Sequence, residues 1–138
     1  MSLGFDGYGC IALHYTIFPL GRPQQIMDLF KEIISRKVPA KIAWEDDEVL
    51  AFHDIQPQAP VHILIVPKET ISGITSARER HTVLLGKLLL VATHLAETEN
   101  VAGTGFRLVI NSGPEGGQTI SHLHVHLLGG RPFSWPPG

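Results

Sequence analysis

The sequence has only one cysteine, Cys10, in 138 residues. A single thiol allows no disulfide within the chain and no cysteine pair for a zinc site, which favours a reducing compartment. Neither sign of charge is in excess, since 11 lysines and arginines stand against 13 aspartates and glutamates. Without a broad cationic surface the chain has no general means of holding a nucleic-acid backbone or an anionic lipid surface. We therefore expect neither nucleic acid nor a membrane as a partner.

Long hydrophobic runs are also missing. The longest near the start, residues 10–20, is interrupted by His14 and Tyr15, and it is shorter than the roughly 20 residues that a membrane-spanning helix needs. No positively charged segment precedes this run, and Arg22 is the only basic residue before Lys31. Such flanks argue against a secretory signal and against an arginine-rich transit peptide. These features predict a cytoplasmic protein, with an organelle left open.

What is present is enough apolar material for one core. The chain is 43% hydrophobic, while its 14 glycines and 10 prolines exclude a coiled coil or a simple helical bundle. Its length suits a single domain. Glycine and proline break any periodic pattern over residues 1–23, so we expect an irregular N-terminal extension. Eight histidines are a high number for this length, and they require a chemical explanation.

Hydrophobic periodicity predicts two helices and five strands. Apolar residues at helical spacing predict a short helix over residues 24–35 and a long helix over residues 78–100. Apolar runs bounded by glycine, proline or acidic residues predict strands over residues 41–45, 49–54, 61–66, 105–111 and 120–128. Because the strands do not alternate with helices along the chain, this order favours an α+β fold with an antiparallel sheet.

The last predicted strand carries His122, His124 and His126, which alternate with apolar residues. Side chains alternate between the two faces of a strand, so the three imidazoles share one face at intervals of roughly 6.6 Å. Burying three imidazoles costs desolvation with no packing gain over leucine or valine, which disfavours a purely structural role. The preceding residues, 111–119, offer amide, hydroxyl and backbone N–H donors. Neutral donors beside imidazoles suit a phosphate group.

A metal site is the main chemical alternative for the same histidines. Two histidines on one strand face can bind a metal, with His53 or His62 as a third ligand. Against a metal, the sequence has no cysteine pair, the predicted strand holds no carboxylate, and the loop before it offers donors rather than acceptors. A nucleophilic role for Cys10 is a weaker hypothesis, because this residue lies in the irregular extension. The residues thus favour a phosphate site without a metal.

Several separated motifs, in the right order, resemble the histidine triad superfamily, and its Hint branch of nucleotide-binding proteins in particular. They are His-Leu-His-Val-His-Leu-Leu at 122–128, Gly-Gly-Arg at 129–131 and Trp-Pro-Pro-Gly at 135–138, with shorter matches at 38–41, 45–47, 50–55, 57–60 and 116–118. The resemblance covers residues 28–138, so it implies one HIT domain there and an N-terminal extension over residues 1–27. It further implies a five-stranded antiparallel sheet that joins the sheet of a partner in a homodimer.

The resemblance implies a purine nucleoside phosphoramidase, which hydrolyses adenosine 5'-monophosphoramidate and related P–N bonds without a metal or another cofactor. His124 would attack the α-phosphorus and form a covalent nucleotidyl-histidine, which water then hydrolyses. His122 and His62 would relay a proton to the leaving amine, and His126 would hold a phosphate oxygen. A nucleotide-binding regulatory or scaffold protein with vestigial hydrolysis is the alternative function.

The same matching implies a binding site for an AMP-like purine nucleotide around the histidines. Asp54 would hold the ribose hydroxyls, and Ile55 would line the base pocket. Trp135 would approach the active site of the partner across the homodimer. The residues expected around the phosphate are Asn111, Gly117, Gln118 and Thr119.

Two features depart from the family. Thr119 stands where relatives commonly have serine, which keeps the hydroxyl and adds a methyl group. Some relatives bind zinc through a cysteine pair near the first helix, and because that pair is missing here we expect no structural zinc. Outside the site, His53 is expected to be non-catalytic. Surface positions are expected for His14, His81 and His94.

Overall fold

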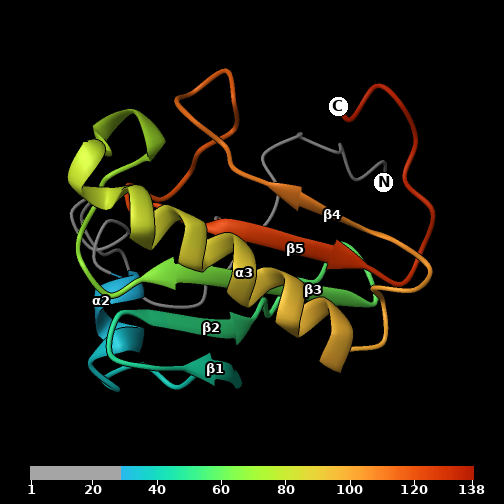
Figure 1. Ribbon diagram of the computed structural model, residues 1–138, viewed down its shortest axis with the longest axis horizontal. Coiled ribbons are helices and arrows are strands. Elements are labelled where there is room, and N and C mark those ends of the chain that lie inside the picture. Colours follow the sequence, from blue (N-terminus) through green and yellow to red (C-terminus); the bar gives the residue numbers. More distant parts are fainter. Residues whose placement is uncertain (1–28) are drawn as a thin grey trace, which may run out of the picture.

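A computed structural model describes residues 29–138, and the expected extension over residues 1–27 lies outside that range. Its centre is a five-stranded sheet with the order β1-β2-β3-β5-β4, in which all four pairings are antiparallel (Figure 1). The predicted α+β class and the five-stranded antiparallel sheet are therefore confirmed. The strands are β1 (Ile42–Glu45), β2 (Val49–His53), β3 (Val61–Pro67), β4 (Phe106–Val109) and β5 (Val125–Gly129).

Two α-helices accompany the sheet. The short helix α2 (Leu29–Ile34) overlaps the helix predicted over residues 24–35, whose beginning lies outside the described range. The long helix α3 (Thr82–Thr98) runs across one face of the sheet (Figure 1). It begins later than predicted because two short 3₁₀ turns, η2 (Ile74–Ser76) and η3 (Glu79–His81), lead into it. No helix between residues 29 and 138 is both long and apolar enough to cross a membrane.

Alternation along the strands divides the interior into two layers. The side chains under α3 include Val49, Ala51, Ile63, Ile65, Val125 and Leu127. Their sequence neighbours point to the other face, where they pack with α2; this layer contains Phe30, Ile33, Leu50, Phe52, Leu64 and Val66. His62 and His126 alternate with members of the first layer, so their rings lie on the α2 side of the sheet.

The last strand is shorter than the sequence predicts, because β5 begins at Val125 and not at residue 120. Its partner β3 ends at Pro67, whose nitrogen has no hydrogen to donate to a ladder. Upstream of Val125 the backbone finds another partner, since the N–H of Leu123 donates to the carbonyl of Ile71 over 2.6 Å. Leu123 nevertheless packs in the core under α3. The alternation of apolar and histidine side chains therefore continues beyond the end of the ladder.

Candidate active site

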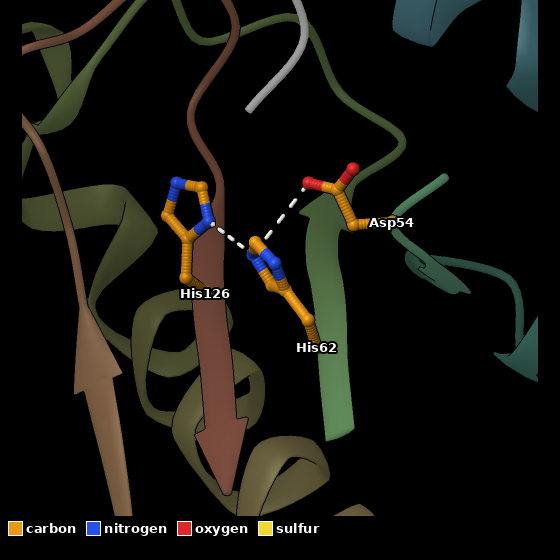
Figure 2. Close-up of side chains that lie close together, drawn as sticks. All are labelled: Asp54, His62 and His126. Carbon is orange, nitrogen blue, oxygen red and sulfur yellow. Dashed lines mark hydrogen bonds and ion pairs between the residues drawn. The ribbon is translucent and has the colours of Figure 1, made fainter. Parts of the chain in front are cut away.

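The neighbouring strands β3 and β5 bring His62 and His126 together. In the ladder Leu64 pairs with His126, so His62 is the diagonal neighbour of His126 on one face of the sheet. His62 Nε2 lies 3.0 Å from His126 Nδ1. Asp54, which follows β2, places Oδ2 3.5 Å from the same His62 Nε2 (Figure 2). All three side chains are buried, so they interact in a site with little water.

His122 and His124 lie just before β5, where Phe30 of α2 packs edge-on against both rings. The Phe30 ring centroid is 5.7 Å from that of His122 and 5.2 Å from that of His124. The His124 and His126 rings are 4.9 Å apart. The structure thus brings the three histidines of the motif together with His62 on one face. We call these four side chains the histidine row.

Hydrogen bonds fix which ring nitrogens of His62 and His126 carry protons. The backbone N–H of Gln58 donates to His62 Nδ1 over 3.1 Å, so in the neutral ring the proton is on Nε2. His62 Nε2–H then donates to His126 Nδ1, which leaves the proton of His126 on its Nε2. Among the described residues this buried Nε2 has no hydrogen-bond partner. His126 therefore offers an N–H donor to a ligand.

The other two histidines carry their protons differently. His124 Nδ1 is 2.7 Å from the carbonyl oxygen of His122. A carbonyl can only accept, so Nδ1 of His124 is protonated and its Nε2 presents a lone pair. His122 Nε2–H donates to the carbonyl of Pro67 over 2.8 Å, which leaves the lone pair on Nδ1. The rings of His124 and His126, 4.9 Å apart, thus carry a lone pair on Nε2 of the first and an N–H on Nε2 of the second.

Burial keeps the histidine row uncharged near neutral pH. Burial, with a smaller contribution from the charge of His124, lowers the pKa of His62 to about 4. Burial likewise lowers the pKa of His126 to about 3, with added effects of His124 and His62. Burial also lowers the pKa values of His122 and His124, although the bond of each ring to a carbonyl opposes the shift. A neutral imidazole can act as a nucleophile, whereas a protonated one cannot.

An open pocket adjoins the histidine row. Phe30 lines the pocket and contacts the row, while Asp54 lines the pocket and faces His62. Ile55 also lines it and is 63% exposed. Its walls are mainly apolar, formed by Leu29, Phe30, Ile33, Val38, Pro39, Ala40, Phe52, Ile55 and Leu64. A pocket with mainly apolar walls and one carboxylate suits a flat, largely apolar ligand that carries hydroxyl groups.

The glycine-rich residues 112–117 form a tightly bonded loop. Gly117 has a φ of 76°, in the left-handed region, and its N–H donates to the carbonyl of Pro114. A Cβ atom on Gly116 would lie 2.3 Å from the carbonyl oxygen of Ser112. Only glycine allows the backbone to approach itself so closely. The N–H of Gly117 is thus committed to the loop rather than turned toward a ligand.

The Gln118 side chain also holds this loop. Its amide nitrogen donates to the carbonyls of Ser72 and Ile120, and its amide oxygen accepts from the N–H of Gly113. Both amide hydrogens are therefore in use, and in this conformation Gln118 has no donor left for a phosphate. This geometry makes it a residue that shapes the loop beside the histidine row.

The remaining residues predicted to bind the nucleotide are partly or largely exposed. Asn111 and Thr119 are half-buried at the two ends of the glycine-rich loop. Trp135, on the C-terminal tail, is 85% exposed, so its ring is available to a ligand or to a second chain.

Among the histidines outside the row, His81 corrects an expectation. It is buried and not on the surface, because its ring is bonded at the start of α3. His81 Nδ1 accepts from the N–H of Arg78 over 2.8 Å, and Nε2 lies 3.1 Å from Glu69 Oε1. His94 is exposed, as expected, and His53 is half-buried. The expectation for His14 lies outside the described residues.

Two residues belong to the site although the sequence analysis gives them no role. Phe30 has the spacing of a core residue in an amphipathic helix, and nothing in that pattern distinguishes a contact with the histidines. Gln58 acts through its backbone N–H, which every residue except proline possesses. No side-chain signal could therefore have identified Gln58 from the sequence.

The cluster of Asp54, His62 and His126 also has the spacing of a metal site, because one ligand atom of each lies within 4.8 Å of the others. The hydrogen bonds around it do not fit a metal. A metal-bound histidine normally donates its second ring N–H to an acceptor, whereas His62 Nδ1 accepts from Gln58. His62 Nε2 then retains the proton and has no lone pair for a metal. The arrangement favours a hydrogen-bond chain over a metal centre.

Sequence comparison agrees with this geometry. The HIT domain family matches residues 35–133. The chain is 50% identical over 118 residues to a protein named adenylylsulfatase HINT1 of Arabidopsis thaliana, covering 84% of this chain and 80% of the relative. It is 51% identical over 112 residues to a protein of Brassica juncea named 14 kDa zinc-binding protein, covering 80% of this chain and 98% of the relative.

Solved structures show the same relationship. A HIT family hydrolase from Legionella pneumophila superposes with a TM-score of 0.78 at 45% identity, covering 80% of this chain and 98% of that one. A histidine triad protein from Clostridium difficile superposes with a TM-score of 0.75 at 34% identity, covering 83% of this chain and 97% of that one. The matched range of the family spans all five strands and the whole histidine row. The chain therefore belongs to the HIT domain family.

Proposed function

We propose that this chain is a purine nucleoside phosphoramidase, which hydrolyses adenosine 5'-monophosphoramidate and related P–N bonds and acts as a homodimer. One observation carries the proposal: His124 has a lone pair on Nε2 and His126 an N–H on Nε2, in rings 4.9 Å apart that adjoin a pocket containing Asp54. The relatives named as a hydrolase and as an adenylylsulfatase support hydrolysis at an adenylyl group.

The pocket supplies the binding site in this proposal. The purine ring lies among the apolar walls near Phe30 and Ile55, and the ribose hydroxyls donate to Asp54. This arrangement places the α-phosphate over the histidine row. Asn111 and Thr119, at the ends of the glycine-rich loop, provide neutral polar groups around it. Trp135 of each chain reaches the leaving group in the site of the other.

Cleavage then proceeds in two displacements at phosphorus. His124 Nε2 donates its lone pair to the α-phosphorus, and the P–N bond to the leaving group breaks. The nitrogen takes one proton and departs as an amine, because an amide anion is a poor leaving group. Water next attacks the nucleotidyl-histidine, which releases AMP and restores His124. Dividing the reaction in this way lowers each barrier.

The hydrogen bonds around the flanking histidines support a different role for each. His126 Nε2–H donates to a phosphoryl oxygen as negative charge develops there. His62 and His122, the pair implied as a proton relay, share no hydrogen bond within residues 29–138. The ring proton of His62 is bonded to His126, and that of His122 to the carbonyl of Pro67. We therefore assign protonation of the leaving amine to water that enters the open pocket.

Turnover of a fluorogenic adenosine phosphoramidate, with and without a chelator, tests this function. We expect chelator-resistant turnover, and mass spectrometry at neutral pH should find the adenylyl group on His124. His124→Ala should abolish turnover and adduct, whereas His94→Ala, exposed on α3, should retain both. Absence of turnover by the wild-type protein, or full activity of His124→Ala, would overturn the proposal. Binding of AMP without any adduct would instead indicate a nucleotide-binding regulatory protein.

Adenylyl sulfate is a second candidate substrate, and the hydrogen bonds of His62 and His122 favour it. Sulfate leaves without taking a proton, and the ring protons of His62 and His122 are already bonded within the protein. The name of the Arabidopsis thaliana relative, adenylylsulfatase HINT1, refers to this chemistry. Comparing kcat/KM for the two substrates decides which leaving group the site prefers.

A further inference from the structure

A chain of hydrogen bonds leads from the C-terminal segment into the histidine row. Arg131 Nε–H donates to the carbonyl of Gln58 over 3.0 Å. The N–H of Gln58 donates to His62 Nδ1, and His62 in turn donates to His126. We propose that Arg131 is a positioning residue: by holding Gln58 it keeps the proton of His62 on Nε2, and so keeps the N–H of His126 directed at the phosphoryl group. This inference rests on the proposed function.

The segment between Asp54 and Val61 needs such an anchor. Gln58 is exposed and contributes no side chain to the core. Its side-chain amide donates to the carbonyl of Gln56, two residues away, over 3.1 Å. Gln56 in turn donates its backbone N–H to Asp54 Oδ1. These local bonds shape the loop, but the bond from Arg131 ties Gln58 to a segment 73 residues later in the chain.

Arg131 is itself held in place. Gly130 has a φ of 88°, and a Cβ atom on it would lie 2.8 Å from Pro60 Cβ, so the two segments are in close contact. The Arg131 guanidinium donates to the carbonyl of Pro132 and lies 4.3 Å from the centre of the Phe133 ring. A guanidinium with a fixed plane is well suited to a directed hydrogen bond. Arg131 can therefore restrain Gln58 although it is exposed.

Loss of this restraint has a defined chemical consequence. When Gln58 moves away, His62 can carry its proton on Nδ1 instead, and its Nε2 then presents a lone pair to His126 Nδ1. Two facing lone pairs repel each other, so His126 changes tautomer and carries its proton on Nδ1. His126 Nε2 then faces the phosphoryl oxygen with a lone pair rather than an N–H. The donor that stabilises the developing charge is lost.

Arg131→Gln and Arg107→Gln form a matched pair for the test. The Arg107 guanidinium also lies over Phe133, at 5.0 Å, and it donates to the carbonyl of Ser134. Both variants thus lose one charge and one anchor of the tail, but only Arg131 is bonded to Gln58. We expect Arg131→Gln to lower kcat about 3- to 10-fold, with KM changed less than about twofold. Arg107→Gln should keep kcat within about twofold.

Nitrogen-15 NMR of the histidine rings gives a readout that does not depend on activity. In the wild-type protein Nδ1 of both His62 and His126 should be unprotonated, and a second tautomer should appear in Arg131→Gln. Arg131→Lys, which retains a donor to the Gln58 carbonyl, should recover most of the lost kcat. Unchanged tautomers in Arg131→Gln, or equal losses in Arg131→Gln and Arg107→Gln, would overturn the inference. Lack of wild-type turnover would refute the proposed function, while the tautomer comparison would still decide the role of Arg131.

Discussion

His124 and His126 are two buried imidazoles with opposite hydrogen-bond patterns. His124 donates from Nδ1 to a carbonyl oxygen, whereas His126 accepts at Nδ1 from His62. The free nitrogen is therefore a lone pair in the first ring and an N–H in the second. The two residues are of the same type, so residue type cannot distinguish them. The hydrogen bond at Nδ1 of each ring distinguishes them.

The same burial makes the fold sensitive to acid. In the unfolded chain His62 and His126 have the ordinary histidine pKa of about 6.5, whereas burial lowers their folded pKa values to about 4 and about 3. Between the folded and the unfolded pKa values, the unfolded state binds more protons than the folded state. The stability that the fold gains from these two neutral histidines is therefore complete above pH 6.5 and falls as the pH drops. At pH 5 we expect a loss on the order of 2 kcal/mol for each of these histidines.

Denaturant unfolding at pH 7 and at pH 5 measures this loss as a difference in the free energy of unfolding. His126→Asn should make that difference smaller, because a buried imidazole with a strongly lowered pKa is gone. Gly103→Ala, in the turn after α3, removes no titratable group and should leave the difference as it is in the wild type. An identical pH dependence in His126→Asn and wild type would contradict the assignment.

Among the elements, the end of β5 is fitted closely to the turn that follows α3. A Cβ atom on Gly129 would lie 2.8 Å from Val101 Cβ and 2.9 Å from its Cγ2. Val101 is buried against the core under α3, so it has little room to move. Gly129→Ala should therefore lower the free energy of unfolding by about 1–3 kcal/mol.

Gly103→Ala is the matched control for this substitution. A Cβ atom at Gly103, two residues after Val101, meets nothing within 4 Å. Its effect should stay within about 0.5 kcal/mol in the same denaturation experiment. Equal stability of Gly129→Ala and wild type would show that β5 and the turn do not pack as described.

The strand that carries the histidines shows how far periodicity predicts an element. Alternation over residues 122–127 correctly separates core side chains from the histidines, because alternation reports which face each side chain occupies. It overestimates the strand, since β5 begins only at Val125. A ladder needs a partner backbone, and that partner ends at Pro67, far away in the sequence. Local pattern contains no information about where the partner stops.

At the scale of the whole molecule, α3 exposes several large hydrophobic side chains to solvent. Val83 is 83% exposed, Leu90 72% and Leu89 43%. One end of the sheet is open as well, because within residues 29–138 β4 pairs only with β5. Clustered exposed apolar side chains commonly mark a protein–protein contact. This surface supports the homodimer that the proposed function includes.

Leu90→Arg should weaken that dimer, because the new charge would be buried in the contact without a partner. Light scattering coupled to gel filtration should show a dimeric wild type and a variant whose dimer dissociation constant is at least about tenfold higher. Thr98→Arg adds the same charge at an exposed position at the end of α3 and should remain dimeric. A monomeric wild type, or a dimeric Leu90→Arg, would contradict this use of the surface.

The sequence by itself determined the composition of the site. The spacing of His122, His124 and His126 is a local property, and so is the identity of the motifs that resemble the histidine triad superfamily. The position of Asp54 after an apolar run is equally visible in the sequence. These features require only residue identity and the two-residue repeat of an extended chain.

Only the tertiary structure decided how those residues work together. It joined His62 to His126, placed the N–H of Gln58 on His62, and committed the amide of Gln118 to its own loop. It also buried His81, which the sequence predicts on the surface. Strand register and main-chain hydrogen bonds between distant segments set these contacts. The position of a proton on an imidazole depends on those contacts and not on the imidazole itself.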